Sequence, residues 1–364
     1  MIALPALLIW LYLFFAHGKF WQSGPQLPAE APHEFPEVDI VVPARDEAPT
    51  IAPVIASLLA QDYAGTFRII LVDDNSTDDT AVLAGCAPNL SVLTLRSKPE
   101  GWSGKLWALS RGVAEGRAPL LFFTDADIVH DPRHLSSLVA KLLQSRAEMV
   151  SEMVRLNCRS LAERVLVPAF VYFFQMLYPF NRVNDPRSSV AAAAGGTVLI
   201  RRETLQRSGG IDAIKNALID DVALASLVKK HGPIFLGHSG LAVSIRPYAR
   251  FADIWHMISR TAFTQLRYSA ALLILTLFGL CAVWWMPAAA MVFGHGWQFD
   301  AGLLAFALSA VSYLPTLARY GRSRLWAFTL PLIALVYMAA TLNSALNYWS
   351  GRGARWKSRA YRSG

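Results

Sequence analysis

The sequence predicts an α/β domain with a mixed, mainly parallel sheet flanked by helices. Apolar runs at 38–43, 67–72 and 119–124 have the length and composition of buried strands, and polar residues follow each of them. Apolar residues at helical spacing over 50–61 separate the first two runs. This strand, helix, strand order favours parallel strands, whose ligands are expected at the carboxyl ends of the strands.

Composition predicts that the rest of the chain lies in a membrane. Hydrophobic residues make up 54% of the 364 residues, which is too apolar for an ordinary soluble domain. Apolar runs lie at 2–16, 270–293, 301–318 and 325–346, and the last three approach the ~20 residues that span a bilayer. The first run lacks the basic region and small-residue cleavage site of a signal peptide, so we expect an uncleaved anchor.

These patterns divide the chain into five parts. We predict an N-terminal membrane anchor at 1–21, a Pro-rich linker at 22–36, an α/β domain at 37–267, a C-terminal membrane region of two to three segments at 268–347, and a basic tail at 348–364.

The net charge of +8 is concentrated at the C-terminal end. Eight Lys and Arg residues and no acidic residue follow Asp300, so these eight account for the whole excess. Because the basic residues lie beside apolar segments rather than among stacking aromatics on a soluble domain, the pattern favours a membrane surface over a nucleic acid.

Two carboxylates one residue apart, Asp125 and Asp127, directly follow the apolar run 119–124. Oxygen ligands at a strand end can bind a hard divalent cation that also holds a diphosphate. Alone the motif is weak evidence, because aspartates at strand ends are common in solvated turns.

The surrounding sequence resembles the inverting glycosyltransferases of family 2, which have a GT-A nucleotide-sugar fold. The matching blocks are Val42 to Glu47, Val72 to Asp78, Gly101 to Lys105, Asp125 to Asp127, Gly195 to Thr197, and Asp220 to Leu224. Within the family, the anchor, the C-terminal segments and the stretch 264–268 look most similar to hopene-associated glycosyltransferases. Ceramide-glucosyltransferase-like enzymes are their neighbours.

The resemblance implies a donor site at the first strand ends. It places Pro43, Glu47, Asp73 and Asp74 at the base and ribose of a nucleotide-diphosphate sugar, first of all a UDP-sugar. The alternative is that Asp73 and Asp74 merely begin the helix that follows.

Lys105 and the two aspartates of the Asp-x-Asp motif are predicted to hold the diphosphate. The ammonium of Lys105, in a Gly-rich loop before the helical run 106–109, can pair with phosphate together with the helix N-terminus; a solvated surface lysine is the alternative. Asp127 is the expected ligand of Mg²⁺ or Mn²⁺. Asp125 is expected to bind the same ion, the sugar or the ribose.

Asp220 and Asp221 match the acidic pair of the family, in which the second acid is the base. The resemblance therefore makes Asp221 the catalytic base and Asp220 its orienting neighbour. The alternative is an acidic first turn of a helix over 222–229, stabilised by the helix dipole. Gly195 and Gly196 either let the backbone approach the bound sugar or form a tight turn.

Two further stretches bear on the acceptor. The uncharged run 165–180 is either an interfacial segment that presents a lipid or a buried core helix. The stretch 264–268 imperfectly resembles the Gln-x-x-Arg-Trp motif of membrane synthases and keeps its arginine, so Arg267 is a candidate for diphosphate binding.

The resemblance implies a membrane-bound enzyme that transfers a sugar to a lipid hydroxyl in hopanoid metabolism. Alternatives are a polyprenyl-phosphate sugar synthase, whose acceptor needs no strong base, and a processive polysaccharide synthase, which should have an intact Gln-x-x-Arg-Trp. A non-enzymatic membrane scaffold would have no reason to hold all these blocks.

The basic residues also predict an orientation. Lys19 after the anchor, and the cytoplasmic supply of sugar nucleotides, put the catalytic domain on the cytoplasmic side of the inner membrane in a multi-pass protein. Three full C-terminal spans would leave the basic tail outside, so the run 325–346 is a candidate re-entrant segment.

Overall fold

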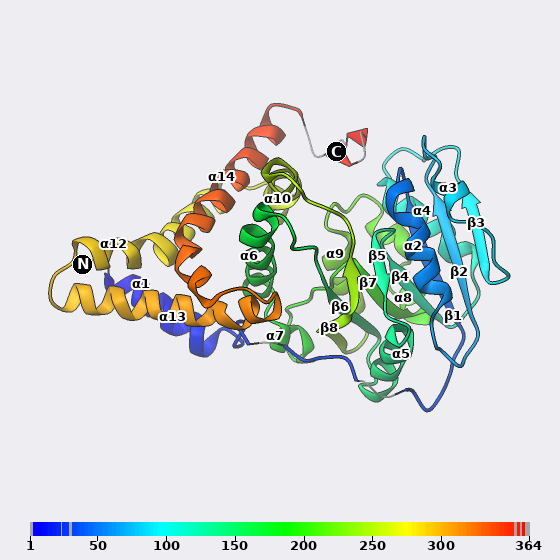
Figure 1. Cartoon of the computed structure of the whole chain (residues 1–364), viewed down its shortest axis with the longest axis horizontal. Helices are drawn as coiled ribbons and strands as arrows, with labels where there is room; N and C mark the ends of the chain where they lie inside the picture. The colour runs from blue at the N-terminus through cyan, green and yellow to red at the C-terminus, as the bar shows by residue number, and fades with distance from the viewer. Residues whose placement is uncertain (1–2, 23, 29–30, 353–354, 357–358, 361–364) are drawn as a thin grey trace. The chain divides into compact units, whose positions relative to one another are not determined.

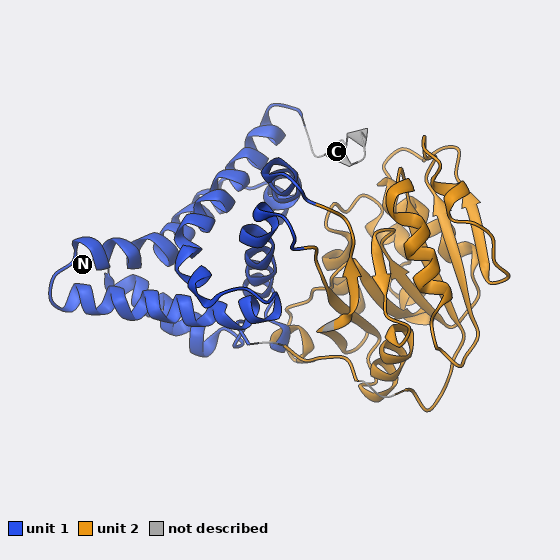
Figure 2. Ribbon diagram, viewed as in Figure 1, with its two compact units in different colours: residues 1–23, 158–181, 248–364 blue, residues 24–157, 182–247 orange. Residues whose placement is uncertain are grey.

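The computed structural model describes residues 3–22, 24–28, 31–352, 355–356 and 359–360. The chain folds into two compact units, shown in two colours in Figure 2. Unit 1 comprises Met1–Ser23, Cys158–Asn181 and Tyr248–Gly364, and unit 2 comprises Gly24–Asn157 and Arg182–Pro247.

Unit 2 is built on a mixed eight-stranded sheet in the order β3-β2-β1-β4-β7-β6-β8-β5 (Figure 1). The strands β1, β2, β3 and β4 pair in parallel, β6 pairs in parallel with β8, and β7 is antiparallel to both β4 and β6. The strands are β1 (Val38–Ala44), β2 (Phe67–Asp73), β3 (Leu90–Thr94), β4 (Leu120–Thr124), β5 (Ile128–His130), β6 (Met149–Arg155), β7 (Thr197–Arg201) and β8 (Ile234–Ser244). The predicted strands at 38–43, 67–72 and 119–124 are confirmed as β1, β2 and β4.

Helices cover both faces of this sheet. The helices α2 and α5 share one apolar core with alternate residues of the strands, among them Ile40, Leu71 and Phe122. On the other face α4 lies close to β1, where a Cβ at Gly112 would come within 2.3 Å of Val41 Cγ1. The helical elements are α2 (Ala48–Leu59), α3 (Thr80–Leu83), α4 (Gly104–Glu115), α5 (His134–Gln144), α7 (Phe180–Asn184), α8 (Arg202–Arg207), the 3₁₀ turn Ile211–Ile214 and α9 (Asp220–Val228).

Apolar helices form unit 1. They are α1 (Ala3–Leu11) with the π-turn Tyr12–Ala16, α6 (Leu161–Leu177), α10 (Phe251–Gln265), α11 (Ala270–Leu280), the π-turn Cys281–Trp285, α12 (Met286–Phe293), α13 (Trp297–Arg319), the 3₁₀ turn Arg324–Thr329 and α14 (Leu330–Trp349). Three continuous helical segments, Ala270–Phe293, Trp297–Arg319 and Arg324–Trp349, are long and apolar enough to cross a membrane. They coincide with the three C-terminal runs that the sequence predicts.

Large apolar side chains of these segments are exposed. Phe278, Phe293 and Leu325 are 69%, 79% and 72% exposed, respectively. Apolar surface of this extent indicates contact with lipid or with another protein.

The run 165–180 forms most of α6, and its middle is buried within unit 1. The Tyr172 hydroxyl hydrogen-bonds to Ser312 Oγ of α13 at 2.6 Å, and the Tyr337 hydroxyl of α14 donates to the Leu166 carbonyl at 3.0 Å. These contacts favour the buried-helix alternative over the interfacial one.

Parts of the predicted 37–267 domain pack in unit 1. These are 158–181, with α6, and 248–267, with α10, whose Phe263 N–H donates to Ser344 Oγ at 3.0 Å. The apolar faces of both helices find their partners among the C-terminal helices, which explains this division. In the predicted tail 348–364, Arg355–Trp356 and Arg359–Ala360 pair as two short antiparallel strands, and residues 353–354, 357–358 and 361–364 lie outside the described residues.

Candidate active site

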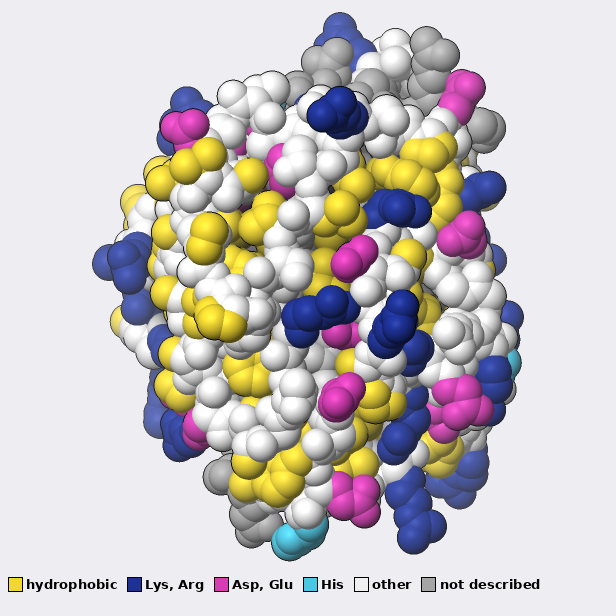
Figure 3. Space-filling model, turned by 90° about the vertical axis from the view of Figure 1, so that its right-hand side faces the viewer, with side chains coloured by type: hydrophobic (Ala, Val, Ile, Leu, Met, Phe, Trp, Pro, Cys, Tyr) yellow, Lys and Arg dark blue, Asp and Glu magenta, His cyan; other side chains and the backbone are white. Residues whose placement is uncertain are grey.

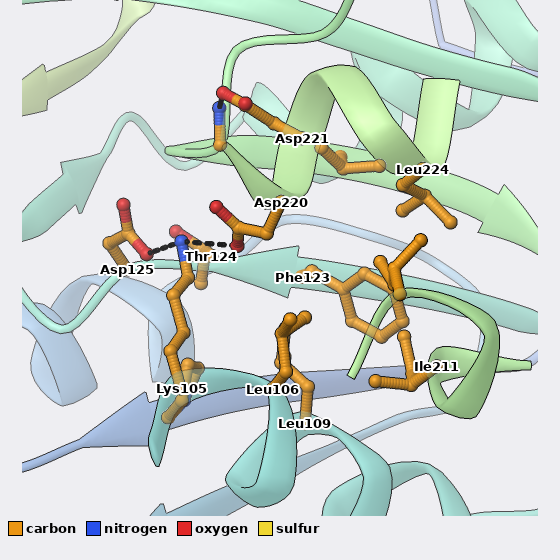
Figure 4. A pocket seen from close by; sticks show the side chains of 14 residues that line it. Lys105, Leu106, Leu109, Phe123, Thr124, Asp125, Ile211, Asp220, Asp221 and Leu224 are labelled. Carbon is orange, nitrogen blue, oxygen red and sulfur yellow. Dashed lines mark hydrogen bonds and ion pairs between the residues drawn. The ribbon is translucent and has the colours of Figure 1, made fainter. Parts of the chain in front are cut away.

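A pocket in unit 2 gathers side chains that lie far apart in the sequence (Figure 4). Asp125 directly follows β4, Lys105 lies in the first turn of α4, Asp220 and Asp221 open α9, and Gly195 lies just before β7. The pocket therefore brings together the acidic pair that contains the predicted catalytic base, the first aspartate of the Asp-x-Asp motif and the predicted phosphate-binding lysine.

Lys105 bridges the two acidic motifs. Its Nζ lies 2.8 Å from Asp125 Oδ1 and 3.2 Å from Asp220 Oδ2, as the dashed lines in Figure 4 show. Burial would lower the pKa of Lys105, but the carboxylates of Asp125 and Asp220 more than offset this, so its pKa lies above the ordinary lysine value. The lysine is a paired ammonium, which contradicts the solvated-surface alternative.

Asp221 is held by backbone amides rather than by a cation. Its Oδ2 accepts the Gly195 N–H at 2.8 Å and its Oδ1 accepts the Val222 N–H at 2.8 Å. Burial, and then the charge of Asp220, raise the pKa of Asp221 to about 7, although Lys105 acts in the opposite direction. A carboxyl group that titrates near neutral pH can accept a proton during reaction.

Gly195 permits this arrangement. A Cβ at position 195 would lie 3.3 Å from Asp221 Oδ2 and 3.4 Å from Lys105 Nζ. A Cβ at Gly196 would lie 3.0 Å from Val154 Cγ1. The pair of glycines thus brings backbone against the predicted base on one side and against β6 on the other.

Asp127 has a separate set of partners. Its Oδ2 accepts hydrogen bonds from Arg246 Nε at 2.8 Å and from Ser244 Oγ at 3.2 Å. The other end of the Arg246 guanidinium donates to Glu47 Oε1 at 2.6 Å. Arg246 therefore joins the second aspartate of the motif to Glu47, which follows β1.

Sequence reasoning missed Arg246. It follows β8, a strand that the apolar pattern did not predict, and β8 reaches the motif by antiparallel pairing of Ser244 with Ile128. A basic residue directly after a strand can indicate a site residue. The pairing of β8 with β5 that brings Arg246 to Asp127, however, joins residues far apart in the sequence.

The residues at the first strand ends shape the surrounding loops. Asp73 Oδ1 accepts hydrogen bonds from the Ser76 N–H, at 3.2 Å, and from the Ser76 hydroxyl. Asp74 is buried, with Arg45 Nη1 3.7 Å from its Oδ2. The helix after β2 begins at Thr80, so neither aspartate opens it.

The remaining predicted residues are split between the units. Pro43 lines the pocket in unit 2. Arg267 belongs to unit 1, where it follows α10 with a φ of 51°. Its contact with the diphosphate stays a prediction.

The described residues contain no group of three or more His, Cys, Asp or Glu side chains placed to hold a metal ion. Asp125 and Asp127 supply carboxylate oxygens, and Mg²⁺ or Mn²⁺ commonly completes its shell with substrate phosphates and water. Lys105 pairs with Asp125 and Arg246 pairs with Asp127, so a divalent ion would share these carboxylates with the two cations. The two carboxylates could hold such an ion together with the phosphates of a donor.

The inner part of the pocket is apolar. Leu106, Leu109, Phe123, Ile211 and Leu224 line it to one side of Lys105 and Asp125 (Figure 4). This lining keeps water from one side of Asp221, which agrees with its raised pKa.

Figure 3 shows one face of the molecule, on which acidic, basic and apolar side chains are intermixed.

The chain is similar to known glycosyltransferases. Residues 39–209 match the model of the family described as glycosyl transferase family 2. A solved structure, the mannosyltransferase PcManGT from Pyrobaculum calidifontis in complex with GDP-Man and Mn²⁺, is similar with a TM-score of 0.59 at 20% identity, covering 94% of this chain and 99% of that one.

Two curated relatives match a shorter part. A dodecaprenyl-phosphate galacturonate synthase of Rhizobium johnstonii is 29% identical over 117 residues, 31% of this chain and 35% of the relative. An N-acetylglucosaminyltransferase of Bradyrhizobium elkanii is 48% identical over 113 residues, 29% of this chain and 60% of the relative. The chain therefore spans about a third of the length of the first relative.

The fold is GT-A-like, a curled mixed sheet with flanking helices, as predicted. The family 2 match and the relatives support a glycosyltransferase enzyme.

Proposed function

We propose that this protein is a membrane-bound inverting glycosyltransferase that moves a sugar from a nucleotide-diphosphate sugar to a lipid hydroxyl. The observation that carries the proposal is the Asp221 carboxyl group, which has a pKa of about 7 and is held by the Gly195 and Val222 amides beside Asp220. A group of this kind suits general-base catalysis at neutral pH.

In the proposed reaction, Asp221 accepts the proton of the acceptor hydroxyl. The hydroxyl oxygen attacks the anomeric carbon from the face opposite the diphosphate, and the new bond to the sugar forms as the bond to the diphosphate breaks. The nucleoside diphosphate leaves with the electron pair, and inversion follows from attack on the opposite face. Asp220 stays paired with Lys105 and orients the acceptor.

Asp127 and Asp125 are the proposed ligands of Mg²⁺ or Mn²⁺. The ion, when bound, offsets the negative charge of the diphosphate and of the leaving group. The likeness to a mannosyltransferase structure with GDP-Man and Mn²⁺ supports this class of donor and ion. Pro43, Glu47, Asp73 and Asp74 are proposed to bind the base and ribose, and we expect UDP as the nucleotide.

The three apolar segments support a membrane location and a lipid acceptor. We place the protein in the inner membrane with the catalytic domain facing the cytoplasm, and a hopanoid hydroxyl is the proposed acceptor. A polyprenyl phosphate is the second candidate, favoured by the dodecaprenyl-phosphate relative. Because a phosphate acceptor arrives ionised and needs no strong base, the near-neutral pKa of Asp221 favours the hydroxyl.

Transfer assays with the full-length protein in detergent test the proposal. UDP- and GDP-sugars are supplied with Mg²⁺ or Mn²⁺, and each is combined with a hopanoid alcohol or with a polyprenyl phosphate. We expect an inverted glycoside on the hopanoid hydroxyl only. Product on the polyprenyl phosphate alone would replace the proposed acceptor, and no product with any donor would refute the proposed activity.

A further inference from the structure

A chain of buried polar side chains runs through unit 2 from Gly196 to Glu152. The Thr124 hydroxyl donates to the Gly196 carbonyl at 2.9 Å and lies 3.0 Å from His130 Nε2. The Nδ1 atoms of His130 and His134 are 2.9 Å apart, and His134 Nε2 faces Glu152 Oε2 at 3.4 Å. The four residues that form this chain, Thr124, His130, His134 and Glu152, are each no more than 3% exposed.

The positions of the hydrogen atoms follow from counting donors. Thr124 has one hydroxyl hydrogen, which it donates to Gly196, so its oxygen accepts from His130 Nε2–H. Burial and the neighbouring His134 lower the pKa of His130 well below its ordinary value, so this ring is neutral and its Nδ1 is an acceptor. His134 must then donate from its own Nδ1. The planes of the two rings are inclined by 14° and their centroids are 5.0 Å apart.

Glu152 ends this chain of side chains. Its Oε2 lies 3.4 Å from His134 Nε2, and both side chains are fully buried. A buried carboxyl group costs less free energy when a polar group faces it.

The Gly196 end of this chain lies in the loop that holds the proposed base. A further side chain, Ser151, fixes the same loop: its Oγ accepts the Ala194 N–H at 2.8 Å and lies 2.9 Å from the Thr197 carbonyl oxygen and 3.1 Å from that of Ala194. Thr124 holds the Gly196 carbonyl on the other side. Between these two attachments, the Gly195 N–H points at Asp221 Oδ2.

We propose that His130 and His134, backed by Glu152, are positioning residues that set the direction of the Thr124 hydroxyl and thereby the Gly195 amide that orients Asp221. The inference rests on the proposed function in one respect, the role of Asp221 as the base. An apolar core would avoid the desolvation of these groups, whereas the polar chain fixes the direction of each hydrogen bond.

A matched pair of variants at position 124 tests the inference in the full-length protein. Thr124→Val keeps the shape but loses the hydroxyl, and Thr124→Ser keeps the hydroxyl. We expect Thr124→Val to lower kcat by about 10- to 100-fold, because a small misplacement of a catalytic group has this effect, with the KM for the donor nearly unchanged. Thr124→Ser should restore most of kcat. A wild-type kcat in Thr124→Val would overturn the inference.

Position 130 offers a second pair. His130→Gln can still donate from a nitrogen close to the position of Nε2, whereas His130→Leu cannot. We expect His130→Gln to keep more kcat than His130→Leu at equal donor KM. Equal losses in the two variants would mean that the ring only fills space.

A measurement that needs no turnover separates this inference from the proposed function. In ¹⁵N-histidine-labelled wild-type protein, NMR should show His130 with its proton on Nε2 and none on Nδ1. A proton on Nδ1 of His130 would contradict the arrangement. If the wild type transfers no sugar, the proposed function fails first, and the NMR result still decides the proton arrangement.

Discussion

Two acidic pairs, Asp125 with Asp127 and Asp220 with Asp221, lie near Lys105. One carboxylate of each pair forms an ion pair with the lysine. Asp125 and Asp220 pair with the ammonium, whereas their neighbours Asp127 and Asp221 do not. Asp127 is held by the Arg246 guanidinium and Asp221 by two backbone amides. The difference teaches that the charge of the partner separates the two carboxylates: the guanidinium neutralises Asp127, whereas Asp221 is buried beside the like charge of Asp220, which raises its pKa.

Replacing Asp221 with Asn tests this division most severely. The amide keeps the shape but cannot accept a proton at neutral pH, so kcat should fall by about 10²- to 10⁴-fold while donor affinity survives. Initial rates and nucleotide titration measure the two quantities. Asp220→Asn is the matched control; if it is inactive and Asp221→Asn is active, the two roles are exchanged.

Replacing Asp127 with Ala tests the other pair. The diphosphate should lose its bridge through the metal ion, so the gain in nucleotide affinity that Mn²⁺ provides, expected to be several kcal/mol, should disappear. Isothermal titration with nucleoside diphosphate, with and without Mn²⁺, measures it. Arg246→Ala is a useful control, because it removes the cation beside Asp127 but leaves the carboxylate. An unchanged Mn²⁺ effect in Asp127→Ala would remove this residue from the metal site.

The pH dependence of kcat tests the ionisation of Asp221. Because the base must be ionised, kcat should rise with pH through a midpoint near the pKa of about 7. The raised pKa also affects the free energy of unfolding, which should fall as kcat rises with pH, because the pKa of Asp221 is higher in the folded state than in the unfolded state. Its stabilising contribution is complete below the unfolded pKa of 3.8 and is lost as the pH rises to about 7. A rate profile that is flat between pH 5 and pH 8 would exclude Asp221 as the base.

Removing Lys105 should have the smallest effect on this profile. The ammonium lowers the pKa of Asp221, so Lys105→Met should move the acid limb of the kcat profile to higher pH. Lys105→Arg keeps the charge and should leave the midpoint close to that of the wild type. A midpoint that moves to lower pH in Lys105→Met would contradict the pairing.

Local patterns predicted much of the fold. The runs that became β1, β2 and β4 are short, apolar and bounded by polar residues, and α9 begins at the predicted pair Asp220 and Asp221. The same pattern could not decide the fate of 165–180, because an apolar helix looks alike whether its neighbours are lipids or other helices. The contacts of Tyr172 and Leu166 with other helices favour the second.

The sequence likewise predicted some residues of the candidate site and not others. Residues that directly follow a strand or open a helix, such as Asp125 and Asp221, carry a sequence signal. Arg246 and the His130–His134 pair carry little, because their roles arise from side-chain contacts made only in the folded sheet. The acceptor and the subfamily remain proposals.

The course of the chain also limits how the protein can be shortened. The chain passes from one unit to the other at 23–24, 157–158, 181–182 and 247–248, so unit 2 is not one continuous stretch. A truncated fragment of residues 24–247 would contain α6 without α13 and α14, leaving the hydroxyl of Tyr172 and the buried side chains around it without the partners that cover them. Such a fragment should aggregate, whereas one in which 158–181 is replaced by a short polar linker should stay in solution.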